Sequence, residues 1–460
     1  MSTRVIEQLA MHILETDFDT LPKEAVEHAK YEIIDVVGCL IGGAKASGCE
    51  MVLDLVREWG GKKEACILVY GNSVPAHNAA MVNSIMTRSF DYEINSPYYA
   101  SKRIPSHTSG TTVPTAFAMA ELESLGGKEL IAALTLGDDI ASRILIASNY
   151  SLESGWDAVG TVNMFGATAI AGRILKLNLY EMLNSFGIVV NQLAGTFQSI
   201  YDGTHSFKLA QGLAARAGIF SARLASKGFT GVKDALFSKY GYFNMYCRTY
   251  NPGVLTEELG DKFYVDRLFK PYPGCMGNHG AIDCALQLVH GANINVEEVE
   301  EITVGVTPLI LDLFVGQPFD PGEVAQATAL FNIRYNIASI LLRKEIKLEY
   351  FTDKFVREPQ IMSLVGRIKL VPKMSPEKML ATDMSIKMKS GQQFNACVDV
   401  PKGDAVCSPL TRLEIKDKFR SNVAFSQTVK IENAEKALDM LENLEQVDSI
   451  TDVVKLLIAE

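Results

Sequence analysis

A histidine and a lysine stand in apolar surroundings. Each could bind an acid when it is positively charged or take a proton from the acid when it is neutral. His107 lies in a Pro-Ser-His-Thr-Ser-Gly loop before an apolar helix predicted over 111–125. A helix N-terminus offers free N–H groups and a partial positive charge, so it can seat a carboxylate. Lys208 opens a helix of small and apolar residues predicted over 207–227, where its ammonium either snorkels outward or points into a cleft. Taken alone, a histidine at such a helix start is more often a capping or packing residue.

Two further segments carry groups suited to acid–base chemistry. A Pro/Gly-rich loop over 269–279 combines Lys270, Tyr272, Cys275 and His279. The loop falls at a predicted domain boundary, where ligand clefts are common, although a purely structural hinge remains the alternative. The other segment follows a helix predicted over 78–87 and contains Asp91 and a second carboxylate two residues later. Acidic residues near helix ends are common, so this segment alone is a weak signal.

Several classes of enzyme are disfavoured because their motifs are absent from the sequence. None of the seven histidines forms an H-E-x-x-H pair, and no Cys/His cluster has metal-ligand spacing. The sequence also contains no P-loop, no G-x-G-x-x-G after a predicted strand and no G-x-S-x-G. We therefore expect an enzyme that uses neither a metal nor a cofactor.

Composition and charge restrict the partners and the compartment. A formal charge of −10, without a run of Lys or Arg, makes nucleic acid and anionic membranes poor partners. The longest apolar stretches are interrupted well short of a membrane span. Eight scattered cysteines without a C-x-x-C motif indicate reduced thiols in the cytoplasm. If the substrate is an anion, positive charge must gather in a pocket.

The length of 460 residues and a change of pattern near residue 265 predict two domains. Residues 1–265 read as a large all-helical domain, and 405–460 are expected to pack back on it. Residues 266–404 read as a smaller α+β lid domain, because apolar residues alternate over 300–306, 367–371 and 384–388. A Gly turn at Ser390-Gly391 followed by 394–400 predicts a β-hairpin, and helices are predicted over 280–289 and 327–342.

In order along most of the chain, these segments resemble the MmgE/PrpD family, which includes 2-methylcitrate dehydratase, cis-aconitate decarboxylase and iminodisuccinate epimerase. The resemblance is carried by Asn83 with Asp91-Tyr92, by His107-Thr108-Ser109-Gly110, by the helix from Lys208 to Ala215, by 225–231, by Lys270-Xaa-Tyr272-Pro273-Xaa-Cys275 with His279, by Phe331 to Tyr335, and by Lys418-Phe419-Arg420. Each motif is moderately specific, and their shared order makes the resemblance strong.

The resemblance implies a mainly α fold, an active site between the two domains, and a homodimer. It assigns Asp91, His107, Lys208, Lys270, His279 and Tyr335 to catalysis. Lys208 and Lys270 would clamp carboxylates, His107 or His279 would act as acid or base, Asp91 would orient a histidine or take the proton, and Tyr335 would donate a hydrogen bond. The expected reaction removes a proton next to a carboxylate of a small polycarboxylate. Dehydration is favoured; epimerisation and decarboxylation share the carbanion, and a catalytically silent binding protein is a further alternative.

This sequence departs from the family pattern at positions expected to bind the substrate. Ile94-Asn95 replace an Asp-Thr pair, and Asp157 stands where a family histidine is expected. About six residues, Tyr98 to Arg103, are inserted before His107. We expect Asn95, Asp157, Tyr272 and Cys275 to contact the substrate, and we expect the exact substrate to differ from those of the well-known members.

Overall fold

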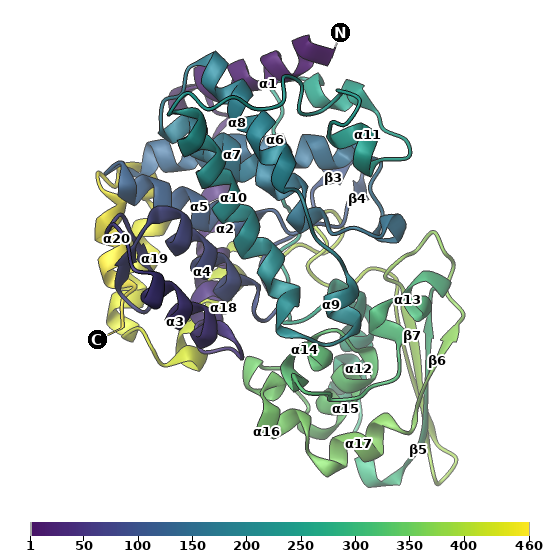
Figure 1. The fold of residues 1–460 in the computed structure, drawn as a ribbon. Helices are drawn as coiled ribbons and strands as arrows, with labels where there is room; N and C mark the ends of the chain where they lie inside the picture. The colour runs from purple at the N-terminus through teal and green to yellow at the C-terminus, as the bar shows by residue number, and fades with distance from the viewer. Residues whose placement is uncertain (1, 460) are drawn as a thin grey trace.

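Glycine- and alanine-rich helices form the centre of the larger domain in the computed structural model, which describes residues 2–459. These central helices are α2 (Lys23–Gly43), α4 (Ala76–Arg88), α5 (Ser109–Leu122), α6 (Gly127–Ala147), α7 (Val162–Ile174) and α10 (Leu209–Ala225) (Figure 1). Helix α10 packs closely on α4 and α7 because its glycines leave room. A Cβ added at Gly212 would lie 2.7 Å from the Met81 carbonyl oxygen, and one at Gly218 would lie 2.4 Å from the Ala167 Cβ.

Shorter elements complete this domain. They are α1 (Ser2–Glu15), α3 (Cys49–Trp59), α8 (Leu179–Val189), α9 (Gln198–Tyr201), α11 (Tyr242–Tyr246), and the hairpins of β1 (Ala65–Ile67) with β2 (Asn72–Val74) and β3 (Tyr98–Tyr99) with β4 (Lys102–Arg103). The prediction of a mainly α, two-domain fold is confirmed. The two hairpins correct the expectation that this domain contains helices alone. The second hairpin is formed by the inserted residues 98–103.

The smaller domain contains a four-stranded sheet in the order β6-β5-β7-β8. Its strands are β5 (Val299–Val306), β6 (Ile368–Pro372), β7 (Thr382–Met388) and β8 (Gln393–Val398), with β5 and β6 parallel and the other pairs antiparallel. Buried and half-buried residues alternate along β7, as expected for a sheet covered on one face. The covering helices include α12 (His279–Gly291), which packs on β7 and β8. The other helices are α13 (Pro308–Asp312), α14 (Ala325–Leu330), α15 (Ile333–Arg343), α16 (Asp353–Val356) and α17 (Pro359–Val365).

The C-terminal segment lies against the larger domain rather than the sheet (Figure 1). Helix α18 (Arg412–Ser426) packs on α2 so closely that a Cβ at Gly38 would lie 3.0 Å from the Phe419 Cα. A buried ion pair joins the same helices, with 2.7 Å between Lys418 Nζ and Asp35 Oδ1. Helix α19 (Ile431–Glu442) also contacts α2, and α20 (Ile450–Leu456) contacts α5.

One predicted helix is broken at a place that matters for the site. The apolar pattern over 327–342 predicts a continuous helix, but the chain forms α14 and α15 with a break at Phe331-Asn332. The Asn332 side chain accepts hydrogen bonds from the backbone N–H groups of Arg334 (3.0 Å) and Tyr335 (3.2 Å) and so caps α15. The break places Phe331 in the wall of the pocket described below.

Two further observations concern the cysteines and the lengths of the apolar helices. All eight cysteines are free thiols. No helix within residues 2–459 combines the length and the apolarity needed to cross a bilayer.

Candidate active site

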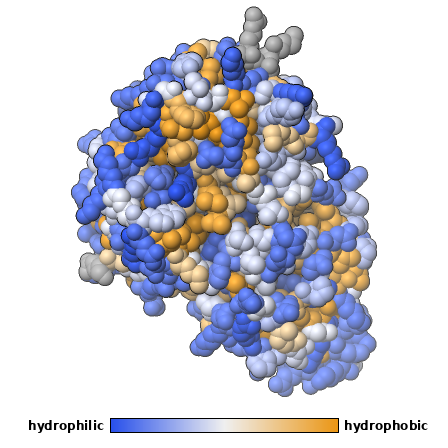
Figure 2. All heavy atoms as spheres, viewed as in Figure 1, coloured by the Kyte–Doolittle hydropathy of each residue, from blue (hydrophilic) through white to orange (hydrophobic). Residues whose placement is uncertain are grey.

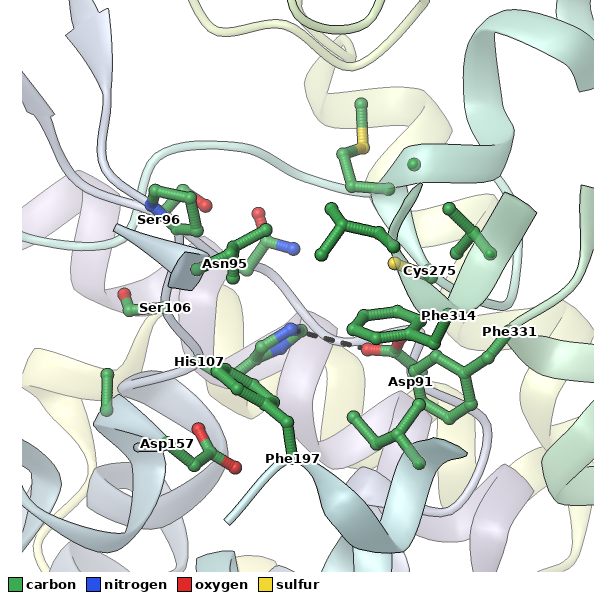
Figure 3. A pocket seen from close by; sticks show the side chains of 18 of the residues that line it. Asp91, Asn95, Ser96, Ser106, His107, Asp157, Phe197, Cys275, Phe314 and Phe331 are labelled. Atoms are coloured by element: carbon green, nitrogen blue, oxygen red, sulfur yellow. Dashed lines mark ion pairs between the residues drawn. The ribbon is translucent and has the colours of Figure 1, made fainter. Parts of the chain in front are cut away.

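A pocket lies between the two domains and is lined by both of them (Figure 3). The space between its walls measures about 710 Å³, part of it open to solvent. The larger domain contributes mainly polar residues, namely Arg88, Asp91, Asn95, Ser96, Arg103, Ser106, His107 and Asp157, together with Phe197. The smaller domain contributes Cys275, Met276, Ile310, Leu313, Phe314, Phe331 and Leu380.

A cluster of five charged or titratable side chains lies at the polar end of the pocket: Arg88, Asp91 and His107 line it, and Glu93 and Lys270 lie behind them. Arg88, the last residue of α4, makes an ion pair with Asp91 and lies 3.3 Å from Glu93 Oε1 through its Nη1. The same nitrogen lies 3.0 Å from Nδ1 and 3.1 Å from Nε2 of His107. Arg88 therefore joins both carboxylates to the imidazole.

Glu93 favours one tautomer of His107. The Nδ1 of His107 lies 3.0 Å from Glu93 Oε1, and a proton on Nδ1 would face this carboxylate. In that tautomer Nε2 carries the lone pair, 3.1 Å from Arg88 Nη1 and 3.4 Å from Asp91 Oδ1. Burial, followed by the charges of Arg88 and Lys270, lowers the pKa of His107 to about 4. The imidazole is therefore neutral near pH 7 and can accept a proton.

Asp91 is held in place by its backbone conformation and by two cations. Its φ of 46° lies in the left-handed region, which aspartate tolerates better than most residues. Lys270 Nζ donates to the Asp91 carboxylate and to the Asp91 carbonyl, both at 2.6 Å, and to the Gly274 carbonyl at 3.2 Å. Burial alone would raise the pKa of Asp91, but the charges of Arg88 and Lys270 lower it. Asp91 is therefore an anion that orients its neighbours rather than a proton acceptor.

The N-terminus of α5 does not offer a seat for a substrate carboxylate, which corrects the expectation from the sequence. The buried carboxylate of Asp266 already accepts the N–H groups of Thr108 (2.8 Å) and Ser109 (3.0 Å) through Oδ2. It also accepts the hydroxyls of Ser109 (2.7 Å) and Ser106 (3.2 Å). Asp266 thus anchors the loop that carries His107.

Asp91, Glu93 and His107 are the one group among residues 2–459 whose ligand atoms are close enough to share a metal ion. Arg88 Nη1 already lies within hydrogen-bonding distance of all three side chains. A guanidinium at that position supplies the positive charge that a metal would bring, and it would repel a cation. The donor set therefore fits the arginine better than a metal ion.

Three residues expected to bind the substrate line the pocket. Asn95 is buried, and its Oδ1 has no hydrogen-bond partner within residues 2–459. Asp157 is also buried, and its Oδ1 accepts the N–H of Val159 at 3.0 Å. Burial raises the pKa of Asp157, while the charge of Arg88 opposes the shift. Cys275 contributes its side chain from the smaller domain, and burial raises its pKa to about 11, so it is a thiol at neutral pH.

The remaining predicted residues do not line this pocket. Lys208 Nζ is buried against the Ser47 carbonyl (2.5 Å) and the Ser89 hydroxyl (3.2 Å), on another side of α4. It does not reach the pocket as a carboxylate clamp. Lys270 is likewise fully buried behind Asp91. It holds that residue rather than facing the pocket.

His279, Tyr335 and Tyr272 also lie behind the lining. His279 is fully buried beside the Tyr272 ring, with 5.4 Å between centroids, and neither ring nitrogen has a hydrogen-bond partner within residues 2–459. Burial lowers its pKa to about 3. The Tyr335 hydroxyl donates to the Tyr350 carbonyl, and the Tyr272 hydroxyl donates to Asp283 Oδ1 at 2.8 Å. Both hydroxyls therefore donate their hydrogen bonds to other groups of the protein.

Reasoning from the sequence assigned no role in the site to Arg88, Glu93 and Asp266, and it considered Arg103 only as one of two cations that the longer loop could add. Arg88 looked like an ordinary basic residue at a helix C-terminus. Glu93 was visible only as a second acid near Asp91. Arg103 lies in the insertion, and Asp266 lies at the domain boundary. The Arg-x-x-Asp-x-Glu spacing from residue 88 to residue 93 was the available signal, because it places charges of both signs at one helix exit.

The architecture is that of a mainly α, two-domain protein with a polar pocket between its domains. Family models for the MmgE/PrpD N-terminal domain and the MmgE/PrpD C-terminal domain match residues 7–254 and 272–446. The chain therefore belongs to the MmgE/PrpD family, as the sequence motifs predicted.

Similar proteins of this family are named as decarboxylases. One is the cis-aconitate decarboxylase-like protein oryM of Aspergillus oryzae, which is 22% identical over 463 residues, covering 95% of this chain and 94% of that protein. Another is the cis-aconitate decarboxylase of Aspergillus terreus, which is 23% identical over 469 residues, covering 95% and 93%. At this identity the relatives support a lyase-type function and leave the specific reaction open.

Proposed function

We propose that this protein is a metal- and cofactor-independent lyase that removes a proton from the carbon next to a carboxylate of a small organic acid. One observation carries the proposal. His107 lies between Glu93 and Asp91 at the polar end of a pocket between the domains, and a proton on Nδ1, toward Glu93, would leave the lone pair on Nε2. A neutral imidazole with an oriented tautomer is a suitable general base.

The two carboxylates beside His107 support this role, against the opposing effect of burial and of the charges of Arg88 and Lys270. When Nε2 takes the proton, the imidazolium lies 3.0 Å from Glu93 and 3.4 Å from Asp91, and both carboxylates stabilise it. The Arg88 guanidinium lines the pocket and can stabilise the negative charge that grows on the substrate carboxylate. The resulting carbanion expels a β-hydroxyl group in a dehydration, which is the reaction we favour. Protonation of the carbanion on its other face would instead give an epimerase.

Decarboxylation is the second candidate, because the similar proteins of both Aspergillus species carry that activity in their names. A decarboxylase must protonate the carbanion left by CO2. His107, with a pKa lowered to about 4, holds little proton to donate at neutral pH. This shortage of a proton on His107 makes proton abstraction our first candidate.

The test is incubation of the purified protein with a panel of di- and tricarboxylic acids in D2O, followed by proton NMR. We expect at least one acid to exchange its α-proton for deuterium, and His107→Gln to abolish that exchange. His290→Gln is the matched control, since His290 is exposed at the end of α12, away from the pocket. Loss of CO2 without α-proton exchange would identify a decarboxylase. Binding of an acid with neither exchange nor turnover would identify a silent binding protein.

Independence from metal has its own test. Because Arg88 already occupies the centre of the Asp91, Glu93 and His107 group, EDTA should leave the exchange rate unchanged. Loss of activity in EDTA that zinc or magnesium restores would assign the reaction to a metal Lewis acid instead.

We also propose that the protein is a homodimer. An exposed apolar surface runs along α10 and α3 and contains Leu209, Leu213 and Phe220 with Met51, Leu55 and Trp59. The helices meet where the Arg216 guanidinium lies 5.1 Å from the Trp59 ring, and hydrophobic residues gather over the middle of this face (Figure 2). Light scattering should give twice the chain mass, and Leu213→Glu should give the monomer mass. A monomeric mass for the unaltered protein would contradict the proposal.

A further inference from the structure

Part of the pocket lining beside the charged cluster is apolar and largely aromatic. Phe197, Phe314 and Phe331 lie close to His107 and Asp91 in the view of the pocket (Figure 3). Their ring centroids are 6.4 Å apart for Phe197 with Phe314 and 5.6 Å apart for Phe314 with Phe331. Five aliphatic side chains extend the wall: Ile200, Ile310, Leu313, Met379 and Leu380. Carboxylates gain nothing from such a surface, whereas hydrocarbon does.

The charges around the pocket leave little surplus to bind an acid with several carboxylates. The cations are Arg88, Lys270 and Arg103, and the anions are Asp91, Glu93 and Asp157. Arg88 and Lys270 are already paired with Asp91 and Glu93. A substrate with three carboxylates would therefore leave negative charge without a partner in a partly buried site.

Arg103 is the cation that remains for a ligand. It lines the pocket from β4, in the inserted hairpin. Within residues 2–459 its guanidinium forms no ion pair within 4.0 Å, and its one hydrogen bond to a side chain goes to Ser96 Oγ at 3.3 Å. Asn95, whose side-chain oxygen lacks a partner, lies in the same lining. A guanidinium without an ion-pair partner is suited to a single carboxylate, whereas the Asn95 oxygen could accept a hydrogen bond from a donor on the ligand.

We propose that the substrate is an amphiphilic acid with no more than two carboxylates, one of them bound by Arg103, and with a short apolar arm against Phe197, Phe314 and Phe331. This inference rests on the proposed proton abstraction, because His107 and Arg88 must still face the carbon next to a carboxylate. It describes the apolar arm of the substrate, which the charged cluster does not bind. Arg103 and the aromatic wall lie in the lining of one pocket, so one molecule can contact both.

The probes are succinate and its 2-methyl, 2-ethyl, 2-propyl and 2-butyl derivatives, with propane-1,2,3-tricarboxylate as the highly charged comparison. Calorimetry on the full-length protein measures affinity, and proton NMR in D2O measures α-proton exchange on the same samples. Burial of each methylene should tighten binding about threefold to fourfold, up to the length at which the arm reaches solvent. The tricarboxylate should bind more weakly than 2-butylsuccinate.

Two groups of variants separate the wall from the anchor. Phe314→Ala should reduce the gain per methylene, and Phe314→Leu should restore most of it. Phe197→Ala tests the same wall at a half-buried position, where loss of the ring threatens the fold less. Arg103→Ala should weaken every acid about tenfold to a hundredfold without changing the gain per methylene. Lys102→Ala, on the exposed neighbour in the same hairpin, and the exposed Phe229→Ala are the matched controls and should change neither quantity.

The two readouts distinguish failure of this inference from failure of the proposed function. Affinity that does not change with arm length, or tightest binding of the tricarboxylate, would overturn the amphiphilic substrate even if exchange occurs. An affinity gain with arm length that Phe314→Ala removes, without exchange of any acid, would support the inference and overturn the proton abstraction. Unchanged affinity in Arg103→Ala would overturn the assignment of the carboxylate anchor.

Discussion

The Nδ1 of His107 lies 3.0 Å from the buried Oε1 of Glu93, two residues beyond Asp91 in the chain. Burial alone would raise the pKa of Glu93, but the charge of Arg88 lowers it, so Glu93 remains an anion. It therefore orients the imidazole as an acceptor and stabilises the imidazolium that proton abstraction would produce.

Glu93→Gln should lower the rate of proton abstraction by about a hundredfold to ten-thousandfold, with little change in substrate affinity, because the amide can support the wrong tautomer and carries no charge. The exchange rate in D2O and calorimetric binding give the two quantities. The exposed Glu432→Gln on α19 is the control. An exchange rate within twofold of the unaltered protein would show that Glu93 does not orient the base.

The titration of His107 provides a second prediction. Its pKa, lowered to about 4 by burial and by the charges of Arg88 and Lys270, implies that the base form persists throughout the neutral range. Activity should therefore stay constant from pH 8 down to about 5 and fall only as pH approaches 4, where the imidazole takes up a proton. Nitrogen-correlated NMR of labelled histidines, assigned with His107→Gln, measures the midpoint directly. A midpoint near 6.5, the ordinary histidine value, would contradict the buried, cation-flanked environment.

Asp266 should matter for both stability and activity although it does not line the pocket. Asp266→Ala removes the acceptor of two backbone N–H groups at the start of α5 and of two hydroxyls. We expect a loss of about 2–4 kcal/mol in the free energy of unfolding, measured by urea denaturation. Activity of the folded fraction should fall too, because the loop of His107 loses its anchor. The exposed Asp261→Ala should alter neither quantity.

The start of α5 illustrates how far the sequence could predict the site. The turn before Thr111 identified a helix N-terminus beside His107, and the structure has α5 beginning at Ser109. The sequence could not show that Asp266, about 160 residues away, fills that N-terminus, because long-range pairing leaves no local pattern. The mainly α fold and the sheet of the smaller domain were accessible because helical and strand periodicity are local properties.

Lys208 and Arg88 illustrate the opposite error. An ammonium in an apolar helix is conspicuous in a sequence, yet the direction of Lys208 depends on which neighbours surround α10, and those neighbours are Ser47 and Ser89. Arg88 is inconspicuous in the sequence, yet its guanidinium joins Asp91, Glu93 and His107. Tertiary packing decides which of the two cations faces the pocket. A single sequence has no periodic pattern that reveals this packing.

The last prediction concerns Asp157, which stands where the resemblance to the family led us to expect a histidine. Its buried carboxyl lines the pocket, so an ionised Asp157 should repel acids with several carboxylates. At an effective dielectric near 20, two unit charges about 4 Å apart interact by ~4 kcal/mol, which corresponds to about a thousandfold in binding. We therefore expect no useful turnover of 2-methylcitrate or cis-aconitate by the unaltered protein. Burial raises the pKa of Asp157, so the repulsion should grow as pH rises and the group ionises.

Asp157→Asn is the sharper variant for this test, because the amide oxygen can still accept the N–H of Val159 while the charge is removed. It should tighten tricarboxylate binding wherever Asp157 is ionised, so the gain should not fall from pH 6 to pH 8, whereas Asp157→His should add attraction only where the imidazole is protonated. Inhibition constants of cis-aconitate and propane-1,2,3-tricarboxylate at both pH values measure the effect. Rapid turnover of cis-aconitate by the unaltered protein would disprove the prediction. Equal inhibition constants for the unaltered protein and Asp157→Asn at pH 8 would show that Asp157 does not select against charge, and the preference would then have to come from Arg103 and the aromatic wall alone.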